Sequence, residues 1–367
     1  MSRSGLPDRL AGRKTGLLSN ARWLTAEFHS AQRWVLDHLG TGLLRLFTPE
    51  HGPWGEAGPG ESVGDGVDRE TGAPVVSLYG PRQAPRPEDL ADLEVLVIAL
   101  PDVGARAWTY LSTTLETMKA AARSGVEVLI LDRPNPLGTA TEGVGVDAGH
   151  TNFVAAYDVP LRHGLTAGRI ARLFALEQEL PPPATCLVPP PPVWVAPSPN
   201  LPTRASALAF AGNVLIEGTN LSEGRGTTRP FLLIGAPWLD AFALAEHLTR
   251  RRHPGLQVRP SVFTPADHKH RGTACAGVEL FITDPAGYRS LPVTLSILDY
   301  ASRHPRFEAN DALDRLWGGS GLRRWLARGA NGPTRDADEA AAVLAGAPAY
   351  QAAFAGRTAR LPSRPDR

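Results

Sequence analysis

This chain has little cysteine, little lysine and no long apolar run, and each shortage excludes a class of protein. Two cysteines, Cys186 and Cys275, are too few for a disulfide framework or a cysteine-built zinc cluster. Three lysines are found among 38 basic residues, and 37 acidic residues balance these, so no net field attracts nucleic acid or an anionic membrane. No stretch approaches about 18 consecutive apolar residues, so we expect no membrane span.

The first 14 residues are polar and charged and have no apolar centre, so they do not form a signal peptide. We therefore expect a protein that is made in the cytoplasm. The mature form of an exported protein would have the same kind of sequence.

The common signatures of nucleotide and serine enzymes are also missing. Five residues separate Gly218 from Gly224, where a phosphate loop needs four, and Arg225 stands where that loop needs lysine. The chain contains no strand-Gly-x-Gly-x-x-Gly-helix pattern and no Gly-x-Ser-x-Gly nucleophile motif. What remains is a set of carboxylates and hydrogen-bond donors, which suits the cleavage of glycosidic bonds.

The first half of the chain alternates short apolar runs with helical patterns. Runs that are apolar on both faces are typical of a buried parallel sheet, and a series of βαβ units predicts a doubly wound α/β domain. A capping-box pattern, Thr113-Thr114-Leu115-Glu116, predicts a helix that begins there and ends near Gly125. We predict strands at residues 15–19, 43–47, 75–78, 95–100 and 126–131, and a further helix at 166–180.

A segment with ten prolines, residues 181–202, separates this half from the second, and we expect an ordered crossing between two domains. The second half has an α+β pattern. The predicted organisation is a Rossmann-like domain over residues 1–200 and a smaller α+β domain over 201–367. We predict helices at 238–252, 291–302, 311–317 and 337–344, and strands at 256–260 and 278–283.

Polar residues gather where the predicted strands end, which is where an open parallel sheet binds its ligands. Glu50 and His51 follow the second strand, and Asp102 and Arg106 follow the fourth. For Asp102 and Arg106, a structural ion pair that holds the loop is an alternative of equal weight to a role in ligand binding. Two further residues of this kind are Asn135, after the fifth strand, and His163, before a helix.

The densest polar segment lies in the second half, at residues 215–231. After Ile216 it has no apolar period, and its glycines allow a ligand to approach the backbone closely. This pattern predicts the wall of a site for a polar, anionic small molecule. Its candidate side chains are Glu217, Asn220, Glu223, Arg225 and Arg229. His268 and His270 form an isolated His-x-His, which we interpret as a solvated loop rather than a metal site.

Several strings of this sequence, in order, resemble the exo-β-N-acetylmuramidase family over about residues 12–330. The resemblance implies a two-domain protein with its active site in the interdomain cleft. It also implies release of β-linked N-acetylmuramic acid from the non-reducing end of peptidoglycan fragments. The strings include Phe47-Thr48-Pro49-Glu50-His51-Gly52, Asp102-Val103-Gly104-Ala105-Arg106, Leu131-Asp132-Arg133-Pro134-Asn135-Pro136, Arg162-His163-Gly164-Leu165-Thr166, Pro197-Ser198-Pro199-Asn200-Leu201-Pro202-Thr203 and the stretch from Glu217 to Phe231.

By position in these strings, Glu50 is the expected catalytic acid/base. The second carboxylate is Glu223 as first choice and Glu217 as second, unless the substrate's own acetamido group takes that role. We expect no cofactor and no metal, and no interaction with nucleic acid. The alternative function is a non-catalytic binder of muramyl sugars, in which no single acidic residue would dominate.

N-acetylmuramic acid carries a lactyl carboxylate, which an arginine fork can bind through two parallel hydrogen bonds. We expect Arg225 and Arg106 to take this part, with Arg229 behind them. The other expected substrate contacts are Asn135, Asn200 and Asn220 on hydroxyl or acetamido groups, His51 and His163 beside carboxylates, Asp102 at its strand end, and Tyr79, Trp108 and Tyr110 against a sugar face.

Overall fold

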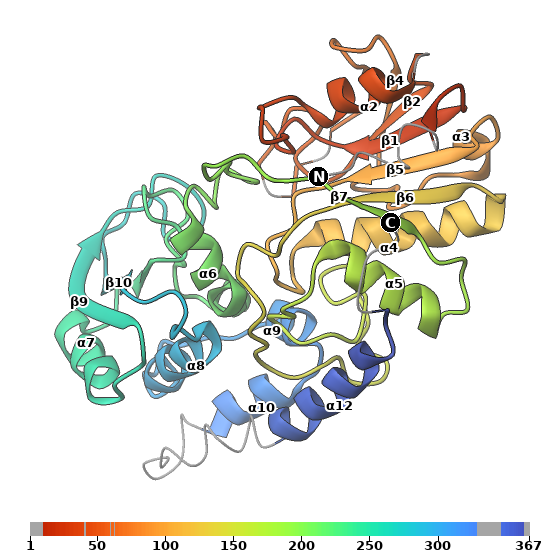
Figure 1. The fold of residues 1–367 in the computed structure, drawn as a ribbon. Helices are drawn as coiled ribbons and strands as arrows, with labels where there is room; N and C mark the ends of the chain where they lie inside the picture. Colours follow the sequence, from red (N-terminus) through yellow and green to blue (C-terminus); the bar gives the residue numbers. More distant parts are fainter. Residues whose placement is uncertain (1–9, 40–41, 59, 62, 329–345, 363–367) are drawn as a thin grey trace.

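The computed structural model describes residues 10–39, 42–58, 60–61, 63–328 and 346–362 and shows two lobes (Figure 1). The first lobe contains a seven-stranded sheet in the order β3-β4-β2-β1-β5-β6-β7. Every neighbouring pair is parallel except β3 with β4, which confirms the predicted doubly wound, mainly parallel sheet. The strands are β1 (Thr15–Ser19), β2 (Arg45–Thr48), β3 (Gly66–Val67), β4 (Pro74–Ser77), β5 (Val95–Ala99), β6 (Glu127–Asp132) and β7 (Ala184–Leu187).

Both faces of this sheet are covered, and successive residues of one strand belong to different layers. Leu18 and Ile98 pack in the layer that contains α4 and α5, whereas Leu17 and Val97 pack in the layer that contains α2. This explains why the strand sequences are continuously apolar rather than alternating. The helices are α2 (Ala31–Leu39), α3 (Pro87–Leu90), α4 (Thr109–Ser124) and α5 (Ala167–Glu177).

Helix α4 begins four residues before the predicted capping box. Thr113 lies inside the helix, and its hydroxyl donates a hydrogen bond to the Thr109 carbonyl 3.2 Å away instead of capping an N-terminus. The predicted end is confirmed, because Gly125 adopts φ 70° and its N–H bonds the carbonyls of Ala121 and Ala122. The earlier start brings Thr109 to the edge of the sheet.

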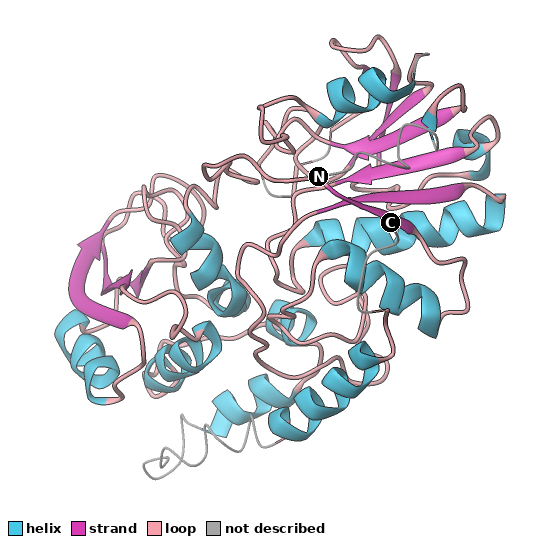
Figure 2. Ribbon diagram, viewed as in Figure 1, coloured by secondary structure: helices cyan, strands magenta, loops and turns pink. Residues whose placement is uncertain are grey.

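The second lobe has a smaller antiparallel sheet in the order β8-β10-β9, with helices against it, as the α+β pattern predicts (Figure 2). Strand β8 escaped prediction because its four residues, Leu233–Ala236, include a glycine and follow a polar segment. The predicted helix at 337–344 lies outside the described residues. The other elements are α6 (Arg204–Asn213), the 3₁₀ helix η1 (Val214–Gly218), α7 (Ala241–Arg250), β9 (Leu256–Phe263), β10 (Cys275–Ile282) and α8 (Ser290–Ala301).

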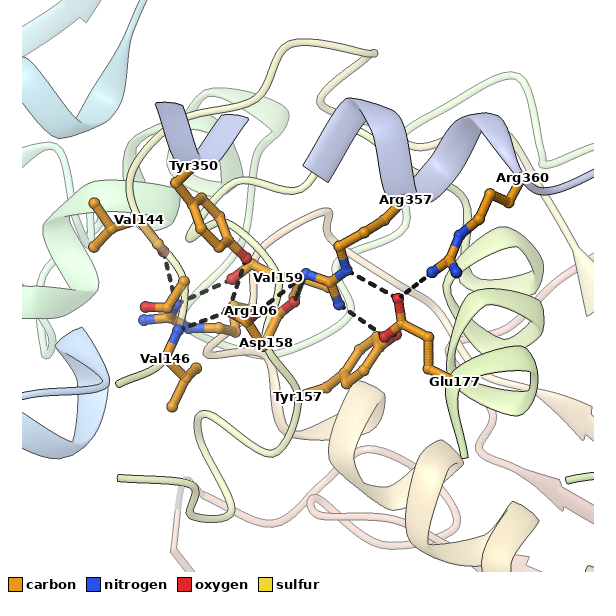
Figure 3. A network of polar contacts seen from close by, with 11 residues as sticks. Arg106, Val144, Val146, Tyr157, Asp158, Val159, Glu177, Tyr350, Arg357 and Arg360 are labelled. Atoms are coloured by element: carbon orange, nitrogen blue, oxygen red, sulfur yellow. Dashed lines mark hydrogen bonds and ion pairs between the residues drawn. The ribbon is translucent and has the colours of Figure 1, made fainter. Parts of the chain in front are cut away.

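The last helices return to the first lobe (Figure 1). They are α9 (Asp311–Trp317), α10 (Gly321–Ala327) and α12 (Ala347–Ala359). Arg357 of α12 donates two hydrogen bonds of 2.9 Å to the Glu177 carboxylate of α5, and Tyr157 donates to the same carboxylate (Figure 3). Tyr350 donates to Asp158 at 2.9 Å in the same network. The C-terminal helix is therefore fastened to the first lobe.

One apolar core extends through both lobes. Leu115 of α4, Phe210 of α6, Leu291 of α8 and Trp317 of α9 belong to a single cluster of buried residues. A shared apolar core of this kind holds two lobes in a fixed relation, unlike the more polar contacts of mobile domains. Among the described residues no helix is both long and apolar enough to cross a bilayer.

Candidate active site

A cavity of about 300 Å³ lies between the two lobes and is lined by residues from both. It is the place where the carboxyl ends of β2 and β4 and the start of α4 meet the segment that follows η1. Its polar lining residues are Glu50, His51, Tyr79, Thr109, Ser198, Asn200, Glu217, Arg225 and His268, and its large apolar ones are Trp108, Phe210 and Phe231.

Glu50 lies just beyond the end of β2 and is only 8% exposed. One carboxylate oxygen, Oε2, accepts a hydrogen bond from the Thr109 hydroxyl at 2.6 Å, and Oε1 accepts one from the Gly60 N–H at 2.9 Å. The Tyr110 hydroxyl donates to the Glu50 backbone carbonyl at 3.0 Å. Neutral donors thus hold this carboxylate in place, and no cation of the described residues forms an ion pair with it.

Tyr79 faces the same carboxylate. Burial raises the pKa of Tyr79, and the negative charge of Glu50 raises it further. The phenol therefore keeps its proton at neutral pH and can donate it in a hydrogen bond to Glu50.

His51 lines the cavity beside Glu50 with a left-handed backbone conformation, φ 75°. Its Nδ1 lies 2.7 Å from the Ala57 carbonyl, and since a carbonyl can only accept, Nδ1 carries the proton. In the neutral ring Nε2 is then the accepting nitrogen. The rings of His51 and Trp108 lie 6.2 Å apart, which places the imidazole against the aromatic wall.

The second lobe supplies a wall of paired charges. Arg225 contacts Glu217 Oε1 through Nη2 at 2.5 Å and Glu223 Oε1 through Nε at 3.2 Å. Its guanidinium lies 5.2 Å from the centre of the Phe231 ring, an arrangement that favours a cation. Lys269 Nζ lies 2.7 Å from the other oxygen of Glu223. Both carboxylates of this wall are therefore compensated by cations.

The two glutamates of this wall have different positions. Glu217 lines the cavity, and burial raises its pKa, an effect that Arg225 partly offsets. Glu223 is 1% exposed and lies behind Arg225, so it does not line the cavity. These positions favour Glu217 over Glu223 as the carboxylate that faces a ligand together with Glu50.

His268 lies in an exposed loop, as its sequence suggested, and it also lines the cavity. Its backbone is left-handed, φ 65°, and its Nδ1 lies 3.7 Å from Glu223 Oε1. Lys269 reinforces this loop, because it donates hydrogen bonds to the carbonyls of Ile216 and Thr219 at 2.9 and 3.0 Å. No sequence pattern placed these two residues beside this wall, since the contact joins segments about fifty positions apart.

Arg106 does not line the cavity, so its position does not support the expected contact with a carboxylate. Its side chain is fully buried, and its two terminal nitrogens donate hydrogen bonds to five backbone carbonyls. Burial lowers the pKa of Arg106 to about 10, which leaves it a cation at neutral pH. The five carbonyls belong to Val144, Gly145, Val159, Leu316 and Trp317.

Asn220 and Arg229 likewise have structural partners and do not line the cavity. The Asn220 side chain donates to the Arg306 carbonyl at 2.6 Å and accepts from the Glu308 N–H at 3.1 Å. Arg229 pairs with Glu279 at 2.6 Å. These side chains shape the second lobe, and the substrate contacts expected of them are not supported by their positions.

Asp102, Asn135, His163 and Tyr110 lie outside this cavity too. His163 Nε2 is 3.7 Å from Asp102 Oδ2; burial lowers the pKa of His163 to about 3 and raises that of Asp102 to about 7. Asn135 donates to the Leu165 carbonyl and accepts from an N–H within its own loop. Tyr110 is buried and acts on Glu50 only through the backbone. The expected substrate contacts that meet Glu50 at the cavity are His51, Tyr79, Trp108, Asn200, Glu217 and Arg225.

The chain resembles known proteins along most of its length. It matches the family description "Exo-beta-N-acetylmuramidase NamZ, N-terminal" over residues 15–205 and "Exo-beta-N-acetylmuramidase NamZ, C-terminal" over residues 208–341. It is 37% identical over 347 residues to the peptidoglycan beta-N-acetylmuramidase NamZ of Bacillus subtilis, with 88% of this chain and 83% of the relative covered.

Two crystal structures of DUF1343 family proteins from Bacteroides fragilis have the same fold. One superposes with a TM-score of 0.82 at 27% identity, and the other with 0.74 at 24%; each covers 95% of this chain and 94% of the other chain. Together with the matches over both lobes, these similarities show that the chain belongs to the exo-beta-N-acetylmuramidase NamZ family.

Proposed function

We propose that this protein is a glycoside hydrolase that releases β-linked N-acetylmuramic acid from the non-reducing end of peptidoglycan fragments. Membership of the family and the name of the Bacillus subtilis relative support the reaction. The structural observation that carries the proposal is one cavity between the lobes, with Glu50 on one wall and Arg225 with Glu217 on the other.

Glu50 is the proposed acid/base. A glycosidic bond breaks when a carboxylic acid protonates the leaving oxygen as the sugar gains oxocarbenium character. The Gly60 N–H can only donate, so Oε1 remains an acceptor, whereas the Thr109 hydroxyl can donate to or accept from Oε2. The catalytic proton therefore belongs on Oε2, and the contact with Thr109 persists in both protonation states.

We propose that Arg225 binds the lactyl carboxylate, which distinguishes N-acetylmuramic acid from N-acetylglucosamine. It is the arginine that lines the cavity, and it is already held in position by Glu217, Glu223 and the Phe231 ring. A fixed guanidinium loses little freedom when it binds a carboxylate. Glu217 is the proposed second carboxylate, and Asn200 is the proposed contact for a hydroxyl or acetamido group.

The direct test is to incubate the protein with a chromogenic β-glycoside of N-acetylmuramic acid and with the matching N-acetylglucosamine glycoside. We expect release of the chromophore from the muramyl compound and much slower release from the other. Proton NMR of the first sugar formed then gives its anomeric configuration and separates retention from inversion. A pure protein that binds the muramyl glycoside but never cleaves it would make the chain a binder instead.

A further inference from the structure

A second cavity, of about 400 Å³, lies at the carboxyl edge of the first sheet and is separate in its lining residues from the one that contains Glu50. The segments that follow β1, β5 and β6 border it, and the crossing segment closes it. In this sheet β1 lies between β2 and β5, so the order of the strands reverses direction at β1. Ligands of open α/β sheets bind at this kind of switch point.

Three arginines line this cavity, Arg22, Arg133 and Arg204. Each donates a hydrogen bond to a backbone carbonyl, and none forms an ion pair with a carboxylate of the described residues. Among the described residues, the carboxylate that lines this cavity is Asp102. It lies beside His163, which is buried and neutral. The cavity therefore has an excess of positive charge.

Several buried polar atoms of these side chains also have no hydrogen-bond partner. They are Nε of Arg22, Nε of Arg133 and Oδ2 of Asp102, and the last of these lies 3.7 Å from Nε2 of His163. Buried polar atoms in folded proteins are almost always hydrogen-bonded, so these atoms, together with the charges of the three arginines, favour a polar ligand in this cavity. The opposite wall is apolar, with Trp194, Val193 and a run of prolines.

We propose that this second cavity is a binding site for a small organic anion, whose carboxylate or phosphate group pairs with the three arginines. The apolar part of the ligand packs against Trp194 and the prolines. A phosphosugar and an acidic peptide both carry the required charge. The inference does not depend on the reaction proposed for the Glu50 cavity.

Three hydrogen bonds connect the two cavities. Trp194 donates to the Leu201 carbonyl at 3.0 Å, Trp108 donates to the Pro101 carbonyl at 2.9 Å, and Arg22 donates to the Gly55 carbonyl at 3.2 Å. Each bond joins a residue of one cavity to the wall or the loop of the other. Because the two cavities share no lining residue, we expect a ligand of the second cavity to bind together with a muramyl ligand and not to compete with it.

The test is isothermal titration calorimetry of the full chain with inorganic phosphate, N-acetylglucosamine 6-phosphate and the dipeptide alanyl-glutamate. We expect one site per chain for at least one probe, and an affinity that falls as salt is added. Arg204→Gln and Arg22→Gln should each lower the affinity for that probe about tenfold, which is the usual effect of losing one charge-assisted hydrogen bond. The probe that binds most tightly identifies phosphate or peptide carboxylate as the recognised group.

Two matched variants complete the test. Arg169→Gln changes an exposed arginine of α5 outside both cavities and should bind the probe as the wild type does. Glu50→Gln should also bind it normally, so that failure of the catalytic proposal leaves this one intact. Circular dichroism confirms that each variant is folded. The proposal is overturned if no probe binds, if the two cavity variants bind like Arg169→Gln, or if N-acetylmuramic acid displaces the probe competitively.

Discussion

The ends of β2 and β5 lie on the same edge of one sheet, and each is followed by an acidic residue, yet the two carboxylates have different surroundings. Glu50, after β2, accepts hydrogen bonds from Thr109 and Gly60 and faces the cavity between the lobes. Asp102, after β5, has an unpartnered oxygen beside a neutral histidine, and burial raises its pKa to about 7.

A third acid, Asp132, is the last residue of β6 and has different surroundings again. Its two oxygens accept hydrogen bonds from the Thr166 hydroxyl at 2.6 Å and the Gly168 N–H at 3.0 Å, at the start of α5. An acidic residue at the end of a strand can therefore serve a ligand or the fold. The hydrogen-bond donors around its carboxylate determine which of the two it serves. Variants that each remove one charge, either from a strand end or from the wall of the second lobe, test whether these residues differ in role.

The largest effect is expected for Glu50→Gln. Loss of the acid should lower turnover of the chromogenic muramyl glycoside by about 10²–10⁴-fold, the usual contribution of general acid catalysis. The fold should persist, because the amide oxygen can still accept from a neutral donor. Glu88→Gln, an exposed glutamate of α3, is the matched control. Near wild-type turnover in a folded Glu50→Gln would remove Glu50 from the mechanism.

Arg225→Ala is expected to have the next largest effect. It should lower kcat/KM for the muramyl substrate by about 10–100-fold more than for the glucosaminyl analogue, because only the former carries the lactyl carboxylate. The ratio of the two kcat/KM values is the measurement. Arg229→Ala changes an arginine of the same segment outside the cavity and should leave this ratio unchanged. Equal losses on both substrates would contradict the proposed recognition.

Asp132→Ala should change stability rather than turnover. It removes the acceptor of two hydrogen bonds at the start of α5, which should lower the free energy of unfolding by about 1–2 kcal/mol. Urea denaturation measures this difference, with Asp92→Ala, an exposed position, as the control. An unchanged free energy of unfolding would show that Asp132, at the end of β6, does not stabilise the start of α5.

The last expected effect, that of Asp102→Asn, depends on pH. Because folding raises the pKa of Asp102, its protonated form stabilises the fold; this contribution is complete below its ordinary pKa of 3.8 and is lost as pH rises through about 7. The asparagine stays neutral throughout. The Tm of the variant minus that of the wild type should therefore rise from pH 4 to pH 8 in thermal unfolding. A constant difference would mean that Asp102 ionises as freely in the fold as in the unfolded chain.

Much of the fold follows from local patterns. The uniformly apolar strands and the glycine at 125 predict β1 and the end of α4 well, because those features depend on neighbouring residues. The start of α4 was wrong by four positions because Thr113 can cap a helix or bond back within one, and its sequence does not distinguish the two. Strand β8 was missed because its pairing with β10 is a tertiary contact.

The site was less predictable, for a related reason. Residue type and position at a strand end pointed to Glu50, but Arg106 and Arg225 have the same chemistry in sequence. Only the fold surrounds Arg106 with carbonyls and opens Arg225 to the cavity. His268 and Lys269 reach Glu223 across some 45 positions, so no local pattern could place them.

The buried Arg106 has a consequence for engineering. It binds the carbonyls of Leu316 and Trp317 at the end of α9, and Leu316 also lines the cavity that contains Glu50. A chimera that exchanges the second lobe between relatives must therefore carry α9 with its own partner arginine. A junction placed between them would make two of the five acceptors of this buried guanidinium depend on a foreign helix, three residues before the threonine that holds Glu50.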